Sequence, residues 1–199
     1  MDRADLEGVL DFLRAAERLK VTTRSAFTSA GRAESVAEHT WRLCLMALVV
    51  APEFSGVDFA RLVKICIVHD LGEAVGGDVP APEQARRLSA GIATGKGDAE
   101  RRDLLSLVAP LPAKLRDEIV ALWDEYEAAV SPEARLAKAL DKLETILQHT
   151  QGQNPPDFDY RFNLGYGRAH TADHPLIVAV RAILDAETER RAQEAEGAR

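Results

Sequence analysis

Apolar residues recur every three to four positions along most of the chain, which is the period of helices that bury one face. In segment 5–20 this period places Leu6, Val9, Leu10 and Leu13 on one stripe, opposite charged residues. The same period predicts further helices over 34–50, 58–70, 97–111, 113–129, 131–150 and 174–193. Alternating stretches are short and β-branched residues are scattered, so we expect no strands and an all-α fold.

Polar residues mark where several of these helices begin. Ser35 and Asp58 each precede an apolar periodic stretch, and both residue types are favoured N-caps. Ser131 is followed by Pro132, and this pair is typical of a helix start because proline fits the first helical position.

Two segments break the helical pattern and are predicted to be loops. Segment 71–82 holds three glycines and two prolines, and segment 151–173 combines glycine, asparagine and proline with aromatic residues. A long aromatic segment of this kind in a compact domain is more often functional or part of an interface than idle.

The length of 199 residues fits one domain, which we expect to span 1–199 with a core at about 5–150 and a C-terminal loop and helix over 151–193. The composition, 46% hydrophobic and 29% charged, is typical of a globular protein rather than a disordered one. The net charge of −7 argues against non-specific nucleic-acid binding, which depends on basic surfaces.

Cys44 and Cys66 both lie in apolar helical stretches and are expected to be buried, reduced thiols. The charged start of the chain lacks the apolar core of a signal peptide. The longest apolar run, 43–51, is too short to span a bilayer. We therefore expect a cytoplasmic protein without membrane contact.

Four ionisable residues stand on or beside the apolar faces of three different predicted helices: His39, His69, Asp70 and Asp141. Each alone has an ordinary explanation, such as a satisfied core histidine, a polar helix end or an ion pair within one helix. Together they would bury imidazoles and carboxylates without matching bases, and a divalent cation would balance that charge. Two imidazoles and two carboxylates suit an octahedral Mn²⁺, Co²⁺, Fe²⁺ or Mg²⁺ with room for water or substrate, and Zn²⁺ is a further option.

The order His, His-Asp, Asp on successive helices resembles the HD-domain metal-dependent phosphohydrolases. Arg24 and the runs "ESVAEH" (34–39), "HDLGEAVGGDVP" (69–80) and "ALDKLETILQ" (139–148) are similar to the branch that contains 5′-deoxynucleotidases. The His-Asp pair alone is weak evidence, but the following glutamate and the G-D-x-P motif make the resemblance specific. It implies an HD-domain helical bundle with the metal site between helices.

The resemblance implies a role for each matching residue. His39, His69, Asp70 and Asp141 would bind one divalent ion (Co²⁺, Mn²⁺, Mg²⁺, Fe²⁺ or Zn²⁺), and Asp70 would thereby also take part in catalysis. Glu73 would move a proton or orient the attacking water.

Three further residues would contact the substrate. Arg24 would grip the phosphate with its planar guanidinium, and Asp78 would contact the sugar hydroxyl or the attacking water. Ser35 lies one helical turn before the first metal histidine. It could orient the phosphate or cap its helix, and we favour the cap.

Several other residues are weighed against ordinary roles. Ser25 stands where the characterised deoxynucleotidases have a tryptophan that crowds the ribose 2′-position, so no preference for deoxyribose follows. Trp41 is expected in the core, Lys142 at the surface rather than on a phosphate, and Glu38 in an exposed ion pair. His149, His170 and His174 have no spacing that would make a second metal site.

The resemblance therefore implies a hydrolase that removes the 5′-phosphate from deoxynucleoside or nucleoside 5′-monophosphates. Alternatives are an HD hydrolase of a dNTP, a cyclic nucleotide or a ppGpp-type alarmone, or a metal-stabilised scaffold that binds nucleotides without turnover. Few arginines lie near the motifs, which disfavours substrates with several phosphates, and Glu73, Arg24 and Asp78 are unnecessary in a scaffold. The resemblance also implies a homodimer, for which segment 158–166 could provide a contact.

Overall fold

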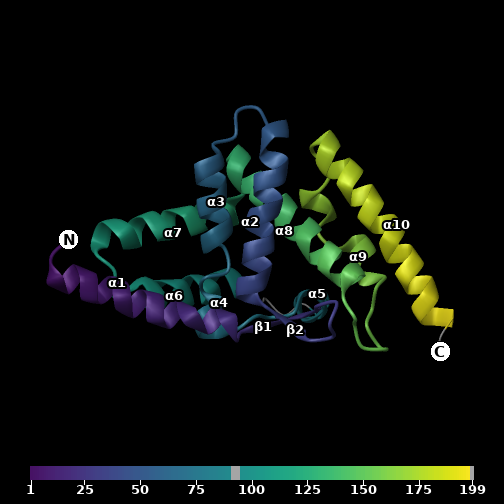
Figure 1. Cartoon of the computed structure of the whole chain (residues 1–199), viewed down its shortest axis with the longest axis horizontal. Coiled ribbons are helices and arrows are strands. Elements are labelled where there is room, and N and C mark those ends of the chain that lie inside the picture. Colours follow the sequence, from purple (N-terminus) through teal and green to yellow (C-terminus); the bar gives the residue numbers. More distant parts are fainter. Residues whose placement is uncertain (91–94, 198–199) are drawn as a thin grey trace.

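Helix α8 (Pro132–Gln151) runs through the middle of the computed structural model, which describes residues 1–90 and 95–197 (Figure 1). Most of its side chains are buried, because other helices cover it on several sides. The helices that pack against it are α2 (Val36–Val50), α3 (Phe59–Val68), α7 (Ala113–Ala128) and α10 (Pro175–Gly197). Side chains from α8 can therefore meet side chains from α2 and α3 inside the molecule.

The other helical segments surround this centre. They are α1 (Arg3–Ala16), η1 (Glu17–Lys20), η2 (Ala51–Glu53), α4 (Glu73–Gly76), α5 (Ala81–Ser89), α6 (Lys96–Val108), α9 (Phe162–Gly165) and η3 (Arg168–His170). Helices α1 and α4 pack on α6, and α9 packs on α10. Figure 1 shows α1 and α10 near opposite ends of the long axis, with the chain termini beside them.

The helices predicted from the apolar period are confirmed, as are their N-caps. Ser35 Oγ accepts a hydrogen bond from the Glu38 backbone N–H, and the Asp58 and Ser131 side chains cap α3 and α8 in the same way. These caps satisfy backbone donors that a helix start would leave unpaired, so local sequence fixes where the helices begin.

The expectation of no strands is wrong. Strands β1 (Thr23–Phe27) and β2 (Ala33–Ser35) form a small antiparallel sheet, in which Thr23 lies opposite Ser35. The chain reverses near Gly31, whose φ of 76° suits glycine. Strands this short are too brief to show an apolar–polar alternation, which is why the periodicity missed them.

The hairpin is attached to the C-terminal end of α8. The Gln148 side-chain amide donates to the Phe27 carbonyl, and the Gln153 backbone N–H donates to the Thr28 carbonyl at 3.0 Å. Residues of β1 are thereby held beside the central helix.

The two predicted loops contain more helix than expected. Segment 71–82 includes α4 and the start of α5, and segment 151–173 includes α9 and η3. Their glycines and prolines break the apolar period, yet they permit short helices. Helix α5 begins directly after Pro80, a position at which proline does not disturb a helix.

The core lies between α2, α3, α6, α7 and α8, where its largest wholly buried side chains are Leu43, Leu62, Ile65, Leu104, Leu140, Leu143 and Ile146. The prediction that Trp41 belongs to this core is wrong, because its side chain is 66% exposed. Helix α2 turns Leu43 and Ala47 inward, and Trp41 lies on the side that no described element covers.

Cys44 and Cys66 are both free thiols, as predicted, but the expected burial is found only for Cys66, since Cys44 is partly exposed. Among the residues that the structure describes, no helix combines the length and the apolar character needed to cross a bilayer.

Gly8 of α1 generates the first testable prediction. A Cβ atom at this position would lie 2.0 Å from the Pro110 carbonyl oxygen, which is backbone and cannot easily move. We expect Gly8→Ala to lower the free energy of unfolding by about 1 to 3 kcal/mol, although alanine is the better helix former. Urea denaturation followed by circular dichroism measures this.

Gly97→Ala in α6 is the matched control, because its Cβ would meet only the Glu127 carboxylate at 3.8 Å, an ordinary contact. Equal stability changes in the two variants would contradict the close packing of α1 on Pro110.

Candidate metal centre and substrate cavity

Helix α8 presents one face to a cavity of about 300 Å³. The cavity-lining residues of this face follow the helical repeat: Lys138, Asp141, Lys142, Thr145 and His149. The hairpin contributes Arg24 and Ser25, and the segment after α3 contributes His69, Asp70, Glu73 and Asp78. Tyr126 of α7 and Tyr166 and His170 of the C-terminal segment complete much of the wall.

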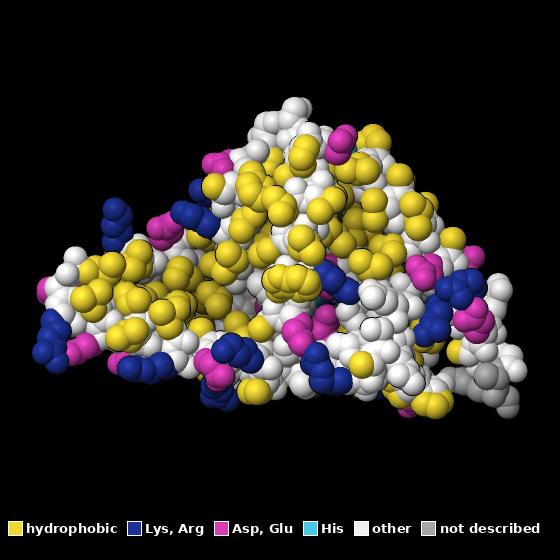
Figure 2. Space-filling model, in the orientation of Figure 1, with side chains coloured by type: hydrophobic (Ala, Val, Ile, Leu, Met, Phe, Trp, Pro, Cys, Tyr) yellow, Lys and Arg dark blue, Asp and Glu magenta, His cyan; other side chains and the backbone are white. Residues whose placement is uncertain are grey.

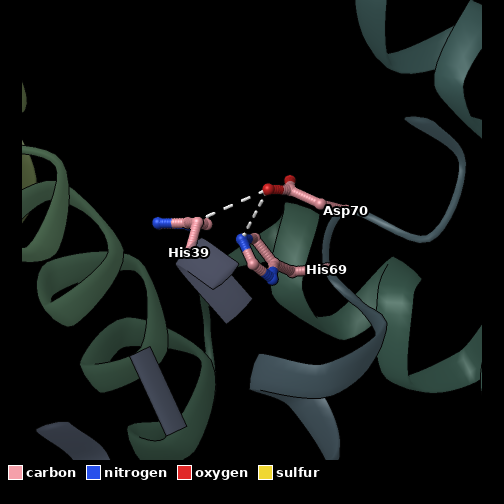
Figure 3. A group of neighbouring side chains, drawn as sticks. All are labelled: His39, His69 and Asp70. Atoms are coloured by element: carbon pink, nitrogen blue, oxygen red, sulfur yellow. Dashed lines mark ion pairs between the residues drawn. The ribbon is translucent and has the colours of Figure 1, made fainter. Parts of the chain in front are cut away.

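Three of the predicted metal ligands converge beneath this cavity. His39 comes from α2, His69 ends α3, and Asp70 follows it, and one ligand atom of each lies within 4.8 Å of the others. His69 Nε2 is 3.0 Å from Asp70 Oδ2, and His39 Nε2 is 3.9 Å from the same oxygen. Figure 3 shows both rings approaching the Asp70 carboxylate.

Asp141, the fourth predicted ligand, lies outside this group of three but touches it. Its Oδ1 is 3.3 Å from His39 Nε2. Neighbouring ligands of an octahedral ion with bonds of about 2.1 Å lie roughly 3 Å apart. The His69–Asp70 and His39–Asp141 separations, 3.0 and 3.3 Å, are close to that spacing, and the His39–Asp70 separation of 3.9 Å is longer.

The donor atoms of the two histidines fit a cation. His39 Nε2 and His69 Nε2 are buried, and neither makes a well-aligned hydrogen bond to any described residue, although carboxylate oxygens are close. Buried polar atoms are normally paired, so two unpaired imidazole nitrogens need an explanation. Lone pairs directed at a shared ion supply one, and a mixed nitrogen and oxygen donor set suits a divalent transition metal.

The opposite nitrogen of each imidazole is anchored. His39 Nδ1 forms a short contact with Glu144 Oε2, and His69 Nδ1 lies 2.7 Å from the Cys66 carbonyl oxygen. Both acceptors hold a proton on Nδ1, so Nε2 is the nitrogen that would offer its lone pair once a cation takes the place of any second proton. That is the tautomer a metal ligand requires.

Asp141 is oriented by a similar arrangement. Its Oδ2 accepts hydrogen bonds from Tyr126 Oη and Lys142 Nζ, both at 2.8 Å. Its Oδ1 is thereby left on the side of His39.

The electrostatics of the cluster favour ionised acids. Burial raises the pKa of Asp70, but His69, His39 and Arg24 outweigh it and hold the pKa below its ordinary value. Burial and Arg24 lower the pKa of His39, yet Glu144 and Asp141 raise it to about 9. Such a preference for extra positive charge is what a cation would also satisfy.

Arg24 reaches the cluster from β1. Its Nη2 donates to Thr145 Oγ1 at 3.0 Å, its Nη1 lies 3.4 Å from Asp70 Oδ2, and its Nε lies 3.6 Å from Glu34 Oε2 on β2. The side chain is only 12% exposed, so the guanidinium is held firmly beside the predicted metal ligands. The hairpin that the sequence did not reveal thus places this arginine.

Glu73 and Asp78 also line the cavity. The backbone after α3 is held by two hydrogen bonds. The Trp123 indole N–H donates to the His69 carbonyl at 3.1 Å, and the Glu73 backbone N–H donates to the Asp70 carbonyl at 3.0 Å. Glu73 therefore begins a short helix just after the His-Asp pair and is nearly buried. A turn at Gly77, with φ of 78°, brings Asp78 back to the cavity.

Other expectations are corrected or confirmed by position. Ser35 caps α2 and is absent from the cavity wall as described, so the structure gives no support for a substrate contact. Lys142 is no ordinary surface lysine, because it lines the cavity and pairs with Asp141. Glu38 pairs with Arg32 at 2.6 Å, as expected for a carboxylate that binds no metal.

The three remaining histidines do not gather. His149 and His170 line the cavity, while His174 stacks on Phe54 with ring centroids 4.1 Å apart. They form no group of possible metal ligands among the described residues.

Sequence reasoning missed several residues around the cluster, namely Glu34, Tyr126, Glu144 and Thr145. Glu144 and Thr145 follow Asp141 by three and four positions, which places them on the same side of one helix. A glutamate within the apolar run of α8 was a readable signal. Glu34 and Tyr126 approach through the hairpin and α7, which no local pattern indicates.

A second group of possible ligands consists of Glu34, His39 and Glu144. Its carboxylates already face arginines: Arg42 Nε is 2.6 Å from Glu144 Oε1, and Arg24 Nε is 3.6 Å from Glu34 Oε2. Part of the positive charge that this group requires is therefore already supplied by side chains.

The fold and this cluster define a helical protein in which buried histidine and aspartate side chains meet between the helices. The HD-domain family profile matches residues 16–189. The chain therefore belongs to the HD-domain family.

Curated relatives point to one branch of that family. The chain is 32% identical to the 5′-deoxynucleotidase HDDC2 of Bos taurus over 90% of its own length and 85% of the relative's. It is also 32% identical to the Homo sapiens 5′-deoxynucleotidase HDDC2, over 90% and 85% of the two chains. A solved structure, described as a predicted metal-dependent phosphohydrolase from Magnetospirillum magnetotacticum, matches with a TM-score of 0.80, 27% identity and 94% coverage of both chains.

His149 in the cavity wall generates a pH prediction. Burial lowers its pKa to about 4, and its Nδ1 lies 2.8 Å from Asn163 Oδ1. As pH falls from 6.5 to 4, the unfolded chain binds a proton on this histidine but the folded chain does not. The free energy of unfolding therefore falls by about 3 kcal/mol over this range. We expect the His149→Gln protein to lose correspondingly less stability over this range.

Urea titrations at half-unit pH steps measure the difference. His174→Gln is the control and should follow the unmodified protein. Parallel curves for His149→Gln and the unmodified protein would show that His149 does not titrate as its burial requires.

Proposed function

We propose that this protein is a metal-dependent phosphohydrolase that removes the 5′-phosphate from deoxynucleoside and nucleoside 5′-monophosphates. The observation that carries the proposal is the meeting of His39, His69, Asp70 and Asp141 at the floor of a cavity that also holds Arg24. The names of the curated relatives, and the description of the structural neighbour as a phosphohydrolase, support the same reaction class.

These four side chains would hold one divalent ion, with Co²⁺, Mn²⁺, Mg²⁺, Fe²⁺ and Zn²⁺ all compatible with the donors. When bound, such an ion supplies positive charge for a phosphoryl oxygen and lowers the pKa of a water molecule. The chain keeps the histidine lone pairs and the Asp141 oxygen available through the anchors at Nδ1 and Oδ2.

Among the described residues that line the cavity, Arg24 and Lys142 are the cationic side chains that contact the predicted metal ligands, whereas Lys138 pairs with Glu127. Arg24 has a planar, permanently charged fork, and its contacts with Thr145 and Asp70 orient it beside the cluster. Lys142 stands on α8 and pairs with Asp141, whose negative charge a divalent ion would share. Arg24 and Lys142 together would match the dianionic charge of a phosphomonoester.

Glu73 would take part in proton transfer, and Asp78 would contact the sugar or the attacking water. Glu73 is buried beside Asp70 in the cavity wall and would take or orient the proton of the attacking water. Asp78 follows a glycine turn and would contact a sugar hydroxyl or the same water. Ser25 lines the cavity with a small side chain, so we propose that ribose and deoxyribose are both accepted.

A phosphate-release assay tests the function. We expect the purified protein to release inorganic phosphate from dAMP, dCMP, dTMP or their ribose counterparts only with added divalent metal. Glu73→Gln should lower the rate by about 100-fold or more, because general acid–base catalysis contributes that much. Melting temperatures check that the variant folds.

Chromatography of the products separates phosphate from pyrophosphate and triphosphate. Metal-dependent release of triphosphate from dNTPs, or of no product from any nucleotide, would contradict the proposed reaction. An unchanged rate in Glu73→Gln would remove its proton-transfer role.

We also propose that residues 1–199 act as one HD domain and assemble as a homodimer in the cytoplasm. Helix α10 packs along α8, which supports one unit, and free cysteines are typical of a reducing compartment. Segment 158–166 is poorly suited to the dimer contact, because Phe158 packs on His149 and Tyr160 is buried.

Helix α2 offers a better dimer surface. Trp41, Leu45, Leu48 and Val49 form a stripe whose side chains are between 43% and 70% exposed. Figure 2 shows hydrophobic side chains gathered over α2 and toward α10. Extended exposed apolar patches of this kind usually mark protein–protein contacts.

We expect Trp41→Glu to convert a dimer into a monomer, since it buries a charge in the contact. Light scattering during size-exclusion chromatography measures the mass. Val130→Glu is the control, because Val130 is 72% exposed but lies in the turn after α7 and should leave the dimer intact. A monomeric unmodified protein at micromolar concentration would contradict the proposed dimer.

A further inference from the structure

Glu144 is a wholly buried carboxylate with both oxygens in use. Its Oε2 contacts His39 Nδ1, and its Oε1 accepts a hydrogen bond from Arg42 Nε at 2.6 Å. Arg42 also donates to Gln151 Oε1 at 3.0 Å. These polar contacts join α2 and α8 directly behind the predicted metal ligands.

Burying this carboxylate needs a reason beyond stability. A buried ion pair is often no more stabilising than apolar residues of similar volume, because desolvation offsets the attraction. An ion pair with Arg42 would not by itself require Glu144 to be buried, because the Arg42 side chain is 20% exposed and could pair with a carboxylate nearer the surface. The position of Glu144 is better explained by its other contact, the imidazole of His39.

The two metal histidines differ in how their rear nitrogens are held. His69 Nδ1 faces a neutral carbonyl oxygen that belongs to its own helix. His39 Nδ1 faces an anionic oxygen from a different helix. The orientation of His39 therefore depends on one side chain, whereas the orientation of His69 depends on the backbone.

We propose that Glu144 is a positioning residue, which keeps the proton of His39 on Nδ1 and directs Nε2 toward the cation, while Arg42 fixes the orientation of Glu144. The inference rests on the proposed metal site. It explains why Nε2 of His39 lies between Asp70 and Asp141 without a hydrogen bond to any described residue.

Glu144→Gln tests this orientation with almost no change of volume. Arg42 offers only donors, so it would hold the carbonyl oxygen of the new amide, and the NH₂ group would face His39 Nδ1. His39 would then carry its proton on Nε2, the nitrogen that should bind metal. We expect Zn²⁺ affinity, measured by isothermal titration calorimetry, to fall by about 10- to 100-fold.

A rescue variant separates positioning from simple stability. In Glu144→Gln combined with Arg42→Met, the amide is free to rotate and to accept from His39 Nδ1–H. We expect this double variant to bind Zn²⁺ about 5-fold or more tightly than Glu144→Gln alone. If Glu144 only balances the charge of Arg42, Glu144→Gln would lower the melting temperature and leave Zn²⁺ affinity unchanged, which would overturn the inference.

Glu133→Gln is the matched control, because Glu133 is a buried glutamate of the same helix α8 whose Oε1 accepts a hydrogen bond from the Asp58 backbone N–H at 2.8 Å and belongs to neither group of possible metal ligands. Its Zn²⁺ affinity should stay within about 3-fold of the unmodified protein. An equal loss in Glu133→Gln and Glu144→Gln would point to general disturbance of buried charge and overturn the specific role.

Nuclear magnetic resonance of the ¹⁵N-labelled, Zn²⁺-loaded unmodified protein reads the tautomer without any variant. We expect a protonated Nδ1 on His39, and a protonated Nε2 would overturn the inference even if Glu144→Gln failed to fold. If the unmodified protein bound no Zn²⁺, Mn²⁺ or Co²⁺, the metal site itself would fail. Tight metal binding that Glu144→Gln retains would refute only the positioning role.

Discussion

The structure depends on gathering negative carboxylates and imidazole lone pairs in a place that water scarcely reaches. His39 is wholly buried, and His69 and Asp141 are 4% and 5% exposed. Ionised groups in such surroundings are costly unless an opposite charge balances them. Arg24 and Lys142 provide part of that charge from the cavity wall, and a divalent cation would provide the rest.

The packing of the helices brings these side chains together. Helix α8 packs against both α2 and α3, so predicted ligands that are far apart in the sequence lie within a few ångströms of one another. Three of the four predicted ligands are held from behind by different groups, which are a glutamate for His39, a backbone carbonyl for His69, and a tyrosine with a lysine for Asp141. Anchoring of this kind fixes where the donor atoms point and thus prepares the site for its ion.

How much the sequence revealed depended on how local each feature is. Helices and N-caps such as Ser131 follow from neighbouring residues, so they could be predicted. The hairpin could not, because its pairing of Thr23 with Ser35 is set by a turn and by docking on α8. Trp41 was misplaced because residue type suggests burial, while exposure depends on which neighbours cover a helix face.

The same distinction holds at the site. The metal ligands could be proposed from residue types in a family order, but the partners that orient them could not. Tyr126 approaches Asp141 from α7, and the hairpin brings Glu34 to Arg24, and both contacts arise only from the tertiary fold. Lys142 was assigned to the surface because a lysine next to an aspartate has no distinctive pattern.

The most direct measurement is an anomalous-scattering map of crystals grown with Mn²⁺. The account predicts one strong peak within about 2.3 Å of His39 Nε2, His69 Nε2 and oxygens of Asp70 and Asp141. No peak between these side chains, or a peak that lies elsewhere while they pair only with one another, would contradict it.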